Sequence, residues 1–292
     1  MLDKELQQAS LWQLGELIQN MICDQMKPSA LCRNAEFYLC DHAAKIGQKF
    51  ISECGKITST SYGMKNPTIE KSTLQFLKEL AKNNNREWFT TNKAKYEKAH
   101  KNMIEFVDAL IPEMNKHDVL VAQTGRQSLY RIYNDVRFSK DKSPYKPRFA
   151  FGFQRETKLR RGGYYVHIAP GASFLGCGFF SPNPDDLKRI RQDIDGNYDQ
   201  WKKLLKSKVI KDNFGELQGE KVLTAPKGFS KDNPAIDLLR HKQFILRHHF
   251  TDDEVLSENF GKEINRIFKS VRPYLDHMSE VLTTDLNGES LF

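Results

Sequence analysis

The spacing of apolar residues divides the chain into a helical start, a strand-rich middle and a helical end. Apolar positions such as Leu11, Leu14 and Ile18 follow helical spacing and predict two short helices within residues 1–54. The polar stretch that follows, 55–71, contains Gly, Ser, Thr and Pro and is typical of a linker. These features predict a small helical extension ahead of the main domain.

The main domain is expected to open with two helices. Ser72 and Gln75 have the spacing of a capping box, which predicts that a helix starts there. The asparagines at 83–85 are expected to end this helix and to cap a longer one. In that second helix apolar residues recur every seven positions from Phe89 to Leu110, which gives a stripe wide enough to pack on a core.

The apolar period then changes from helical to alternating, which indicates strands. Strands are expected over 129–138, 149–153, 164–168, 173–180 and 242–250. Pro170 and Gly171 lie between two of these segments and predict a hairpin. Helical patterns return at 183–206, with Asn183 as the cap, and at 258–283, where a kink is expected at Pro273. Strands grouped between helices, without a strict βαβ rhythm, predict an α+β fold with a mixed or antiparallel sheet packed by several α-helices.

Composition and charge narrow the class of protein. The chain has 292 residues, 39% of them hydrophobic, which is enough for a stable core and excludes a disordered or collagen-like chain. It contains no run of 18 apolar residues and does not begin with the pattern of a signal peptide, so we expect no membrane span and a cytoplasmic location. Residues 1–63 form the predicted extension and 64–292 the main domain, which we expect to fold without the extension.

The net positive charge of the protein is concentrated in one short segment. The net charge of the chain is +8. Between Arg126 and Arg161 there are 11 basic and 3 acidic residues, a net of +8 in 36 residues. Such a surplus attracts phosphate-bearing partners, although a solvated basic face that only keeps the protein soluble has the same composition.

Common catalytic and metal-binding signatures are absent. There is no phosphate-binding loop, dinucleotide fingerprint, nucleophile elbow or zinc-protease motif, so we expect no cofactor. The cysteines at 23, 32, 40 and 54 lack the close pairs of a zinc site, and an odd total of five favours reduced thiols. We therefore predict no metal site.

The basic segment 131–148 is the main candidate for ligand binding. If 129–138 is a strand, Arg131, Tyr133, Asp135 and Arg137 share one face, and Asp135 orients an arginine whose planar fork suits phosphate or carboxylate. The opposite face would carry Tyr130, Ile132, Val136 and Phe138. The candidate ligand-binding residues are Arg86, Arg131, Arg137, Ser139, Lys142, Tyr145 and Lys146.

Three functions remain open. The first is binding of a phosphorylated ligand, nucleic acid included. The second is an enzyme that acts on a phosphorylated or carboxylated small molecule, with Asp135, Asp141, Tyr145 or His167 as proton-transfer candidates. The third is an interaction domain whose basic face meets an acidic protein. An arginine–aspartate network that only ties strands together is the structural alternative for the same residues.

Three stretches carry a resemblance to a known family. They are FLKELAKNNNREWFTTNKAKYE at 76–97, the pair RIYNDVRFSKDKSPYKPRF at 131–149 and GGYYVHIAPGASFLGCG at 162–178, and KGFSKDNPAIDLLRHKQF at 227–244. In order and spacing the chain resembles the bacterial and fungal family called domain of unknown function 2461, from about Ser72 to Leu282. The resemblance implies an α+β domain without an activity to carry over. The family usually has RIYRDVRF, and Asn134 stands here in place of its second arginine, so an anion site that used this arginine would be weaker or differently shaped.

Overall fold

The computed structural model describes residues 67–137, 139–285 and 289–291. The two helices expected within 1–54 and the cysteines at 23, 32, 40 and 54 lie outside the described residues. Cys177 is the one cysteine within them, and it is buried in the core. Among the helices that the structure describes, none combines the length and the apolar character needed to cross a membrane.

A four-stranded antiparallel sheet lies at the centre of the domain, in the order β1-β2-β3-β4. The strands are β1 (Phe149–Gln154), β2 (Gly163–Ile168), β3 (Ser173–Phe179) and β4 (Phe244–Phe250). The hairpin expected at Pro170 and Gly171 joins β2 to β3, and β4 pairs with β3 after a long helical segment. The structure thus confirms the predicted α+β class and resolves the sheet as antiparallel.

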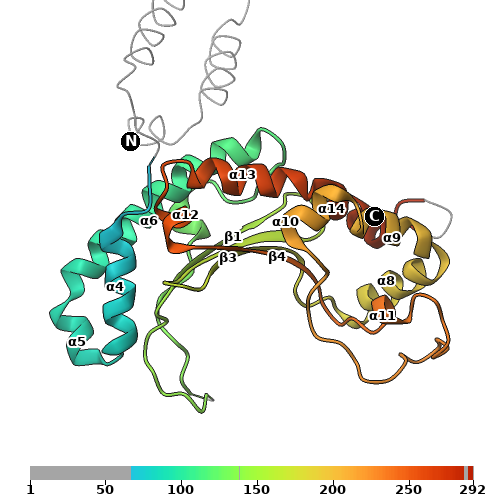
Figure 1. Ribbon diagram of the computed structural model, residues 1–292, viewed down its shortest axis with the longest axis horizontal. Coiled ribbons are helices and arrows are strands. Elements are labelled where there is room, and N and C mark those ends of the chain that lie inside the picture. Colours follow the sequence, from blue (N-terminus) through green and yellow to red (C-terminus); the bar gives the residue numbers. More distant parts are fainter. Residues whose placement is uncertain (1–66, 138, 286–288, 292) are drawn as a thin grey trace, which may run out of the picture. The chain divides into compact units, whose positions relative to one another are not determined.

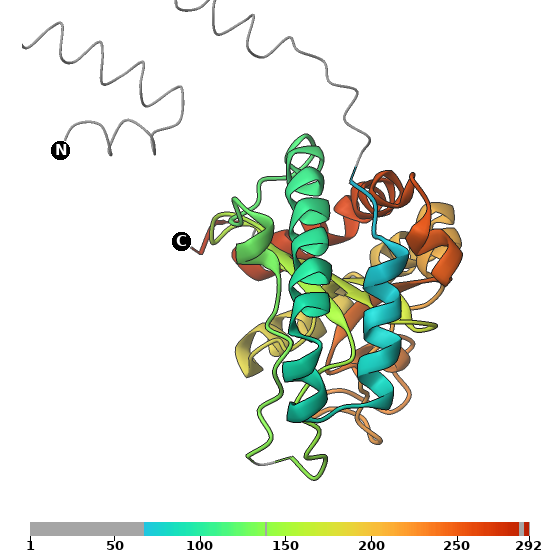
Figure 2. The ribbon, with the colours of Figure 1, turned by 90° about the vertical axis from the view of Figure 1, so that its left-hand side faces the viewer.

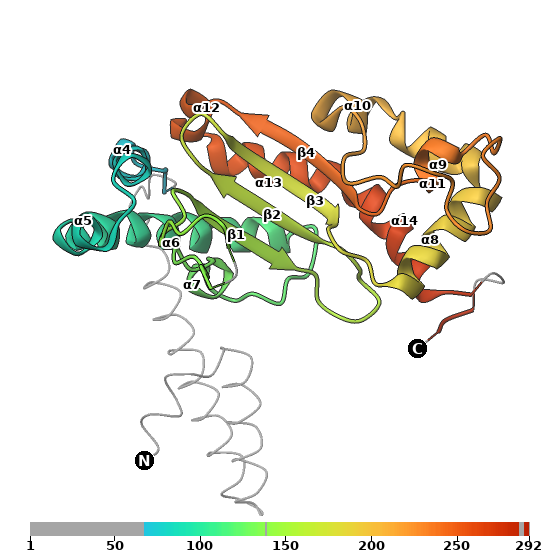
Figure 3. The ribbon, with the colours of Figure 1, turned by 90° about the horizontal axis from the view of Figure 1, so that it is seen from below.

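One face of the sheet forms the core. The alternation of the strands places Phe151, Val166 and Leu175 in one row across β1, β2 and β3, all completely buried. Helices α6 (Lys93–Asn115), α13 (Phe260–Ser270) and α14 (Arg272–Thr283) lie against this face (Figures 1 and 3). The ring of Phe106 on α6, for example, lies 6.4 Å from that of Phe151.

The remaining helices flank the sheet and leave its other face open between them (Figures 1 and 3). On one side α4 (Lys71–Lys82) runs beside α6 and connects to α5 (Arg86–Thr91) (Figure 2). On the other side are α8, α9 and α11, with α10 beside β4. The bounds are α7 (Gly125–Ser128), α8 (Pro184–Gly196), α9 (Tyr198–Leu205), α10 (Lys208–Phe214), α11 (Ile236–Leu239) and α12 (Asp252–Leu256).

Several predicted helix boundaries are wrong. The long helices expected after Asn85 and over 183–206 are each divided in two, at Asn92 and Asn197. The helix expected over 258–283 is divided at Val271, two residues before the kink expected at Pro273. The helix caps at Asn85 and Asn183 are confirmed, because both side chains accept a backbone N–H hydrogen bond.

The predicted capping box is also wrong. Helix α4 begins at Lys71, after Glu70, and no side chain caps its first turn. The Ser72 hydroxyl donates to the Glu70 carboxylate at 2.7 Å, and the Gln75 amide donates to Glu79 at 3.0 Å. Neither side chain therefore takes part in a capping box.

The strand expected over 129–138 does not form. Leu129 and Tyr133 make only isolated bridges, to Phe151 and Tyr145 respectively. Residues 131–147, of which residue 138 is not described, instead form an irregular hairpin that we call the arm; it projects beyond the end of α5 (Figures 1 and 2). Ile132 is buried and Tyr130 is exposed, so the two do not share a face as predicted.

Candidate anion-binding site

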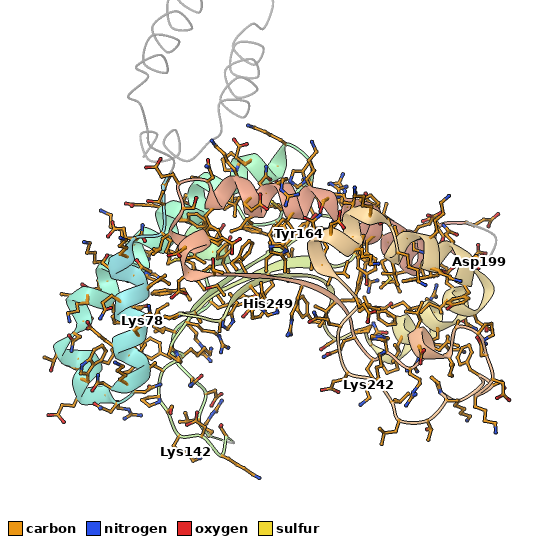
Figure 4. All side chains as sticks on the ribbon, in the orientation of Figure 1. Lys78, Lys142, Tyr164, Asp199, Lys242 and His249 are labelled. Carbon is orange, nitrogen blue, oxygen red and sulfur yellow. The ribbon has the colours of Figure 1, made fainter. Side chains whose placement is uncertain are left out.

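The open face of the sheet carries a pocket of about 840 Å³. Gly152, Tyr165 and Arg247 line it, and they belong to one row of paired residues across the four strands, in which Gly176 stands between Tyr165 and Arg247. The adjacent row contains Ala150, His167, Phe174 and His249. His249 lies on this open side of the sheet in Figure 4. In β2, Tyr165 and His167 belong to these two rows, whereas Val166 and Ile168 are fully buried on the opposite face, which is the alternation expected of the strand at 164–168.

Two arginines line the pocket without an acidic partner. Arg148 comes from the segment that enters β1, and Arg247 comes from the middle of β4. Both side chains are half-buried, and their Nε atoms are buried without a hydrogen-bond partner. Within the described residues, neither guanidinium forms an ion pair with a carboxylate. Buried donors of this kind usually have a partner, so these two are candidates for holding an anion.

Other arginines near the sheet are already neutralised, which sets Arg148 and Arg247 apart. Arg161 lies at the opposite end of the same pocket, and its guanidinium is paired with Asp186. Arg155, on the covered side, is paired with Asp118 at 2.7 Å. The unpaired positive charge of the pocket is therefore concentrated at the Arg148 and Arg247 end.

His167 lies among these groups as a neutral imidazole. Burial, together with the positive charges of Arg148 and Arg247, lowers the pKa of His167 to about 4. Its ring stacks on Phe174 with the centroids 4.7 Å apart, and its Nδ1 lies 3.4 Å from the Tyr165 hydroxyl oxygen. At neutral pH the residue therefore offers one donor and one acceptor nitrogen to a ligand, and no charge.

The arm holds most of the residues singled out from the sequence. The Arg137 guanidinium donates two hydrogen bonds to Asp135, at 2.9 and 2.7 Å, so the expected contact between Asp135 and an arginine is present. This contact lowers the pKa of Asp135. Lys142, near the tip of the arm in Figure 4, donates to the Val136 carbonyl at 2.9 Å. Asp141 accepts the Ser143 backbone N–H at 2.9 Å and shapes the turn, next to the exposed Ser139.

Tyr145 anchors the base of the arm. Its ring is buried and lies parallel to that of Phe89, with the centroids 3.9 Å apart. Burial raises the pKa of Tyr145, and the charge of Arg86, the first residue of α5, acts in the opposite direction. The sequence placed Tyr145 among ligand-binding and proton-transfer candidates, and its surroundings are those of a packing residue.

Lys146 links the arm to the pocket electrostatically. Burial and the charges of Arg148 and Arg131 lower its pKa, so these three basic groups lie close together at the base of the arm. Lys146 also donates to the Arg131 carbonyl at 3.4 Å. The four arm residues Arg131, Arg137, Lys142 and Lys146 do not line the pocket, whereas Arg148 does.

Asn134, the departure from the usual family pattern, has a structural role here. Its side-chain amide donates to the carbonyl oxygens of Ser143 and Tyr145 at 2.9 and 3.1 Å, and its backbone N–H donates to Pro144. These bonds hold the two sides of the arm together. Asn134 itself does not line the pocket.

Sequence reasoning missed Arg247 and did not single out Arg148. Arg247 shares one face of β4 with Ile245 and His249, two positions away on either side, and this alternation is the signal that places it on the sheet face opposite Leu246. Which residues it meets depends on the pairing of β4 with β3, more than 60 positions earlier in the sequence. Within the described residues there is no group of three or more His, Cys, Asp or Glu side chains placed to hold a metal ion.

Comparisons with known proteins agree with the family resemblance. A family model described as a conserved hypothetical protein (DUF2461) matches residues 72–277, which include the whole sheet, α5–α13, most of α4 and the first half of α14. No curated protein and no solved structure matches the chain. Because the matched segment covers more than half of the chain, the protein belongs to the DUF2461 family.

Proposed function

We propose that the domain binds a small anionic ligand, bearing a phosphate or carboxylate group, in the pocket on the open face of the sheet. The observation that carries the proposal is the pair Arg148 and Arg247, which line one pocket with Nε donors that have no partner. Arginine forks match the oxygens of phosphate and carboxylate. The pocket volume of about 840 Å³ lies within the range typical of small-molecule sites.

This proposal places the anion at the inner end of the basic segment instead of along the arm. The arm's Arg137 is engaged with Asp135, and Lys142 with a backbone carbonyl. Arg148 ends the same segment 131–148 but lies on the sheet, beside the neutral His167. Nucleic acid and an acidic protein remain alternative partners of the exposed arm, and the salt dependence described in the Discussion tests the first of them.

An enzymatic function is favoured by one specific observation, the position of His167. This imidazole lies where a ligand held by Arg148 and Arg247 would meet it, and its neutral form accepts a proton. The second candidate function is therefore an enzyme that acts on a phosphorylated or carboxylated small molecule, with His167 as the proton acceptor. Turnover that is lost in His167→Gln while ligand binding is retained would support it.

The binding proposal is tested with inorganic phosphate and isothermal titration calorimetry. Arg247→Lys keeps the charge and loses the fork, so we expect phosphate affinity to fall about tenfold or more. Arg126→Lys is the matched control, since Arg126 is exposed on α7 and does not line the pocket; it should bind as the wild type does. Equal affinity of both variants, or no phosphate binding by the wild type at low salt, would overturn the proposal.

A further inference from the structure

The same pocket presents exposed aromatic rings, which an anion alone does not require. Tyr130 is 54% exposed and Phe180 is 36% exposed, and both line the pocket. Their ring centroids lie 6.1 and 6.0 Å from that of Tyr165, which lies 5.8 Å from Phe174. Apolar rings left in water at a pocket wall are a typical surface for stacking a ligand ring.

Two glycines, Gly152 and Gly176, flank Tyr165 in the strand row beneath these rings. A Cβ atom at Gly152 would lie 2.7 Å from the Tyr130 hydroxyl oxygen, so any other residue there would displace the end of the Tyr130 side chain. A Cβ atom at Gly176 would reach the Phe180 ring at 3.5 Å and the Arg247 side chain at 3.8 Å. The absence of a side chain at Gly152 therefore leaves room for Tyr130, whereas a Cβ atom at Gly176 would make only ordinary contacts.

The rings and the unpaired charges are immediate neighbours. The Arg247 guanidinium carbon lies 4.9 Å from the centre of the Phe174 ring. Arg148 and Arg247 are both near enough to Tyr165 to oppose the effect of burial, which raises the pKa of its hydroxyl. A ligand that contacts both the aromatic rings and the arginines therefore carries a ring and an anionic group close to each other.

We infer that the ligand is a nucleoside phosphate, whose base packs on Tyr130, Tyr165 and Phe180 while its phosphate is held by Arg148 and Arg247. The inference rests on the proposed anion site and adds the chemistry of the second half of the ligand. Aromatic side chains stack on any base, because every base has a π-face. A pocket of about 840 Å³ suits a single nucleotide.

The test compares ligands with and without the base. Binding of AMP, UMP and ribose 5-phosphate is measured by calorimetry with the full chain. We expect both nucleotides to bind about tenfold or more tightly than ribose 5-phosphate, the gain typical of stacking one base. Equal binding of all three would overturn the inference and leave the anion site standing, whereas failure of all three would remove the anion site as well.

Variants then locate the stacking surface. Tyr130→Leu and Phe180→Leu alter exposed side chains, so both should fold, lose most of the nucleotide's advantage and bind ribose 5-phosphate as the wild type does. Tyr133→Leu is the matched control, because Tyr133 is 49% exposed and does not line the pocket. Nucleotide affinity that is unchanged in both test variants, or binding of a single-stranded oligonucleotide without binding of AMP, would contradict the inference.

Discussion

The side-chain amide of Asn84 exchanges two hydrogen bonds with the backbone of Tyr145. Its Nδ2 donates to the Tyr145 carbonyl at 2.8 Å, and the Tyr145 N–H donates to its Oδ1 at 3.1 Å. With the stacked ring of Phe89, these bonds join the segment around α5 to the arm. Two of the stretches that carry the family resemblance, 76–97 and 131–149, are therefore parts of one structural unit.

Replacing Asn84 should destabilise the domain through this unit. Asn84→Ala leaves the N–H of Tyr145 without its partner and the carbonyl with only the Asn134 amide, and we expect a loss of about 1–3 kcal/mol in the free energy of unfolding. The measurement is urea denaturation. Asn83→Ala is the control, since the Asn83 side chain makes one exposed hydrogen bond, to Glu79. Equal losses in the two variants would argue against a special role for the contact between Asn84 and Tyr145.

A buried ion pair behind the sheet links the segment after α6 to β1. Asp118 and Arg155 are 2.7 Å apart, with side chains 0% and 1% exposed. Asp118 also accepts the Tyr164 hydroxyl at 2.7 Å. Asp118→Ala leaves the buried Arg155 with only its half-exposed partner Asp276 and the Tyr164 hydroxyl without its acceptor, so it should cost stability toward the lower end of about 3–5 kcal/mol. Asp276→Ala removes a half-exposed partner of Arg155 and should cost clearly less in the same denaturation experiment.

The same pair predicts how stability depends on pH. Burial raises the pKa of Asp118, but the hydrogen bond from Tyr164 and the charge of Arg155 outweigh it and hold the pKa below the usual value of 3.8. A lowered folded-state pKa gives stability that is present above the unfolded pKa and is lost as pH falls through the folded pKa. Below about pH 4 the wild type should therefore lose stability more steeply than Asp118→Ala. Parallel curves from denaturation at several pH values would contradict this.

The titration of His167 should respond to an anion in the pocket. Its pKa of about 4 is set by burial and by Arg148 and Arg247. A bound anion offsets those two charges, so the pKa should rise, and by linkage phosphate should bind more tightly as pH falls toward that pKa. The measurement is an NMR titration of the imidazole with and without phosphate. A free-protein pKa near 6.5, or no shift with phosphate, would count against the arrangement described.

The salt dependence of nucleic-acid binding tests the alternative role of the arm. For duplex DNA the slope of log affinity against log salt is about −0.9 per phosphate neutralised, so four contacts from the arm would give roughly −3.6. The small-ligand account instead expects little DNA binding at any salt. If DNA does bind and Lys142→Ala reduces the slope by about one, the arm is a nucleic-acid surface. If Arg137→Lys lowers only the melting temperature, its pairing with Asp135 is structural.

The strands could be predicted because their alternation is local. Phe149, Phe151 and Phe153 all face the core, as their spacing indicates. The breaks at Asn92 and Asn197 could not, since asparagine is compatible with a continuing helix, whereas Pro273 signalled the break beside it at Val271. The strand expected at 129–138 failed for a related reason. Alternation around Ile132 is equally compatible with an irregular hairpin, whose closure depends on Asn134 and residues nine to eleven positions away.

The sequence predicted the chemistry of the candidate site but not its location in the fold. The charge count pointed to the segment that ends in Arg148, and the alternation of β2 put Tyr165 and His167 on one face. Arg247 joins these residues only through the register of β4 against β3, and a pairing between segments so far apart in the sequence leaves no local signal. The arm's arginines looked equally suitable from the sequence, because the expected contact of Asp135 with an arginine could not be assigned to Arg131 or Arg137; the structure shows it with Arg137.

The most direct test of the account compares two double variants that each remove two positive charges. One is Arg148→Gln with Arg247→Gln in the pocket; the other is Lys140→Gln with Lys142→Gln on the exposed arm. Phosphate binding is measured by calorimetry, with melting temperatures to confirm folding. The account predicts that the pocket variant loses detectable binding while the arm variant retains it. Loss of binding in the arm variant with binding retained in the pocket variant would contradict it.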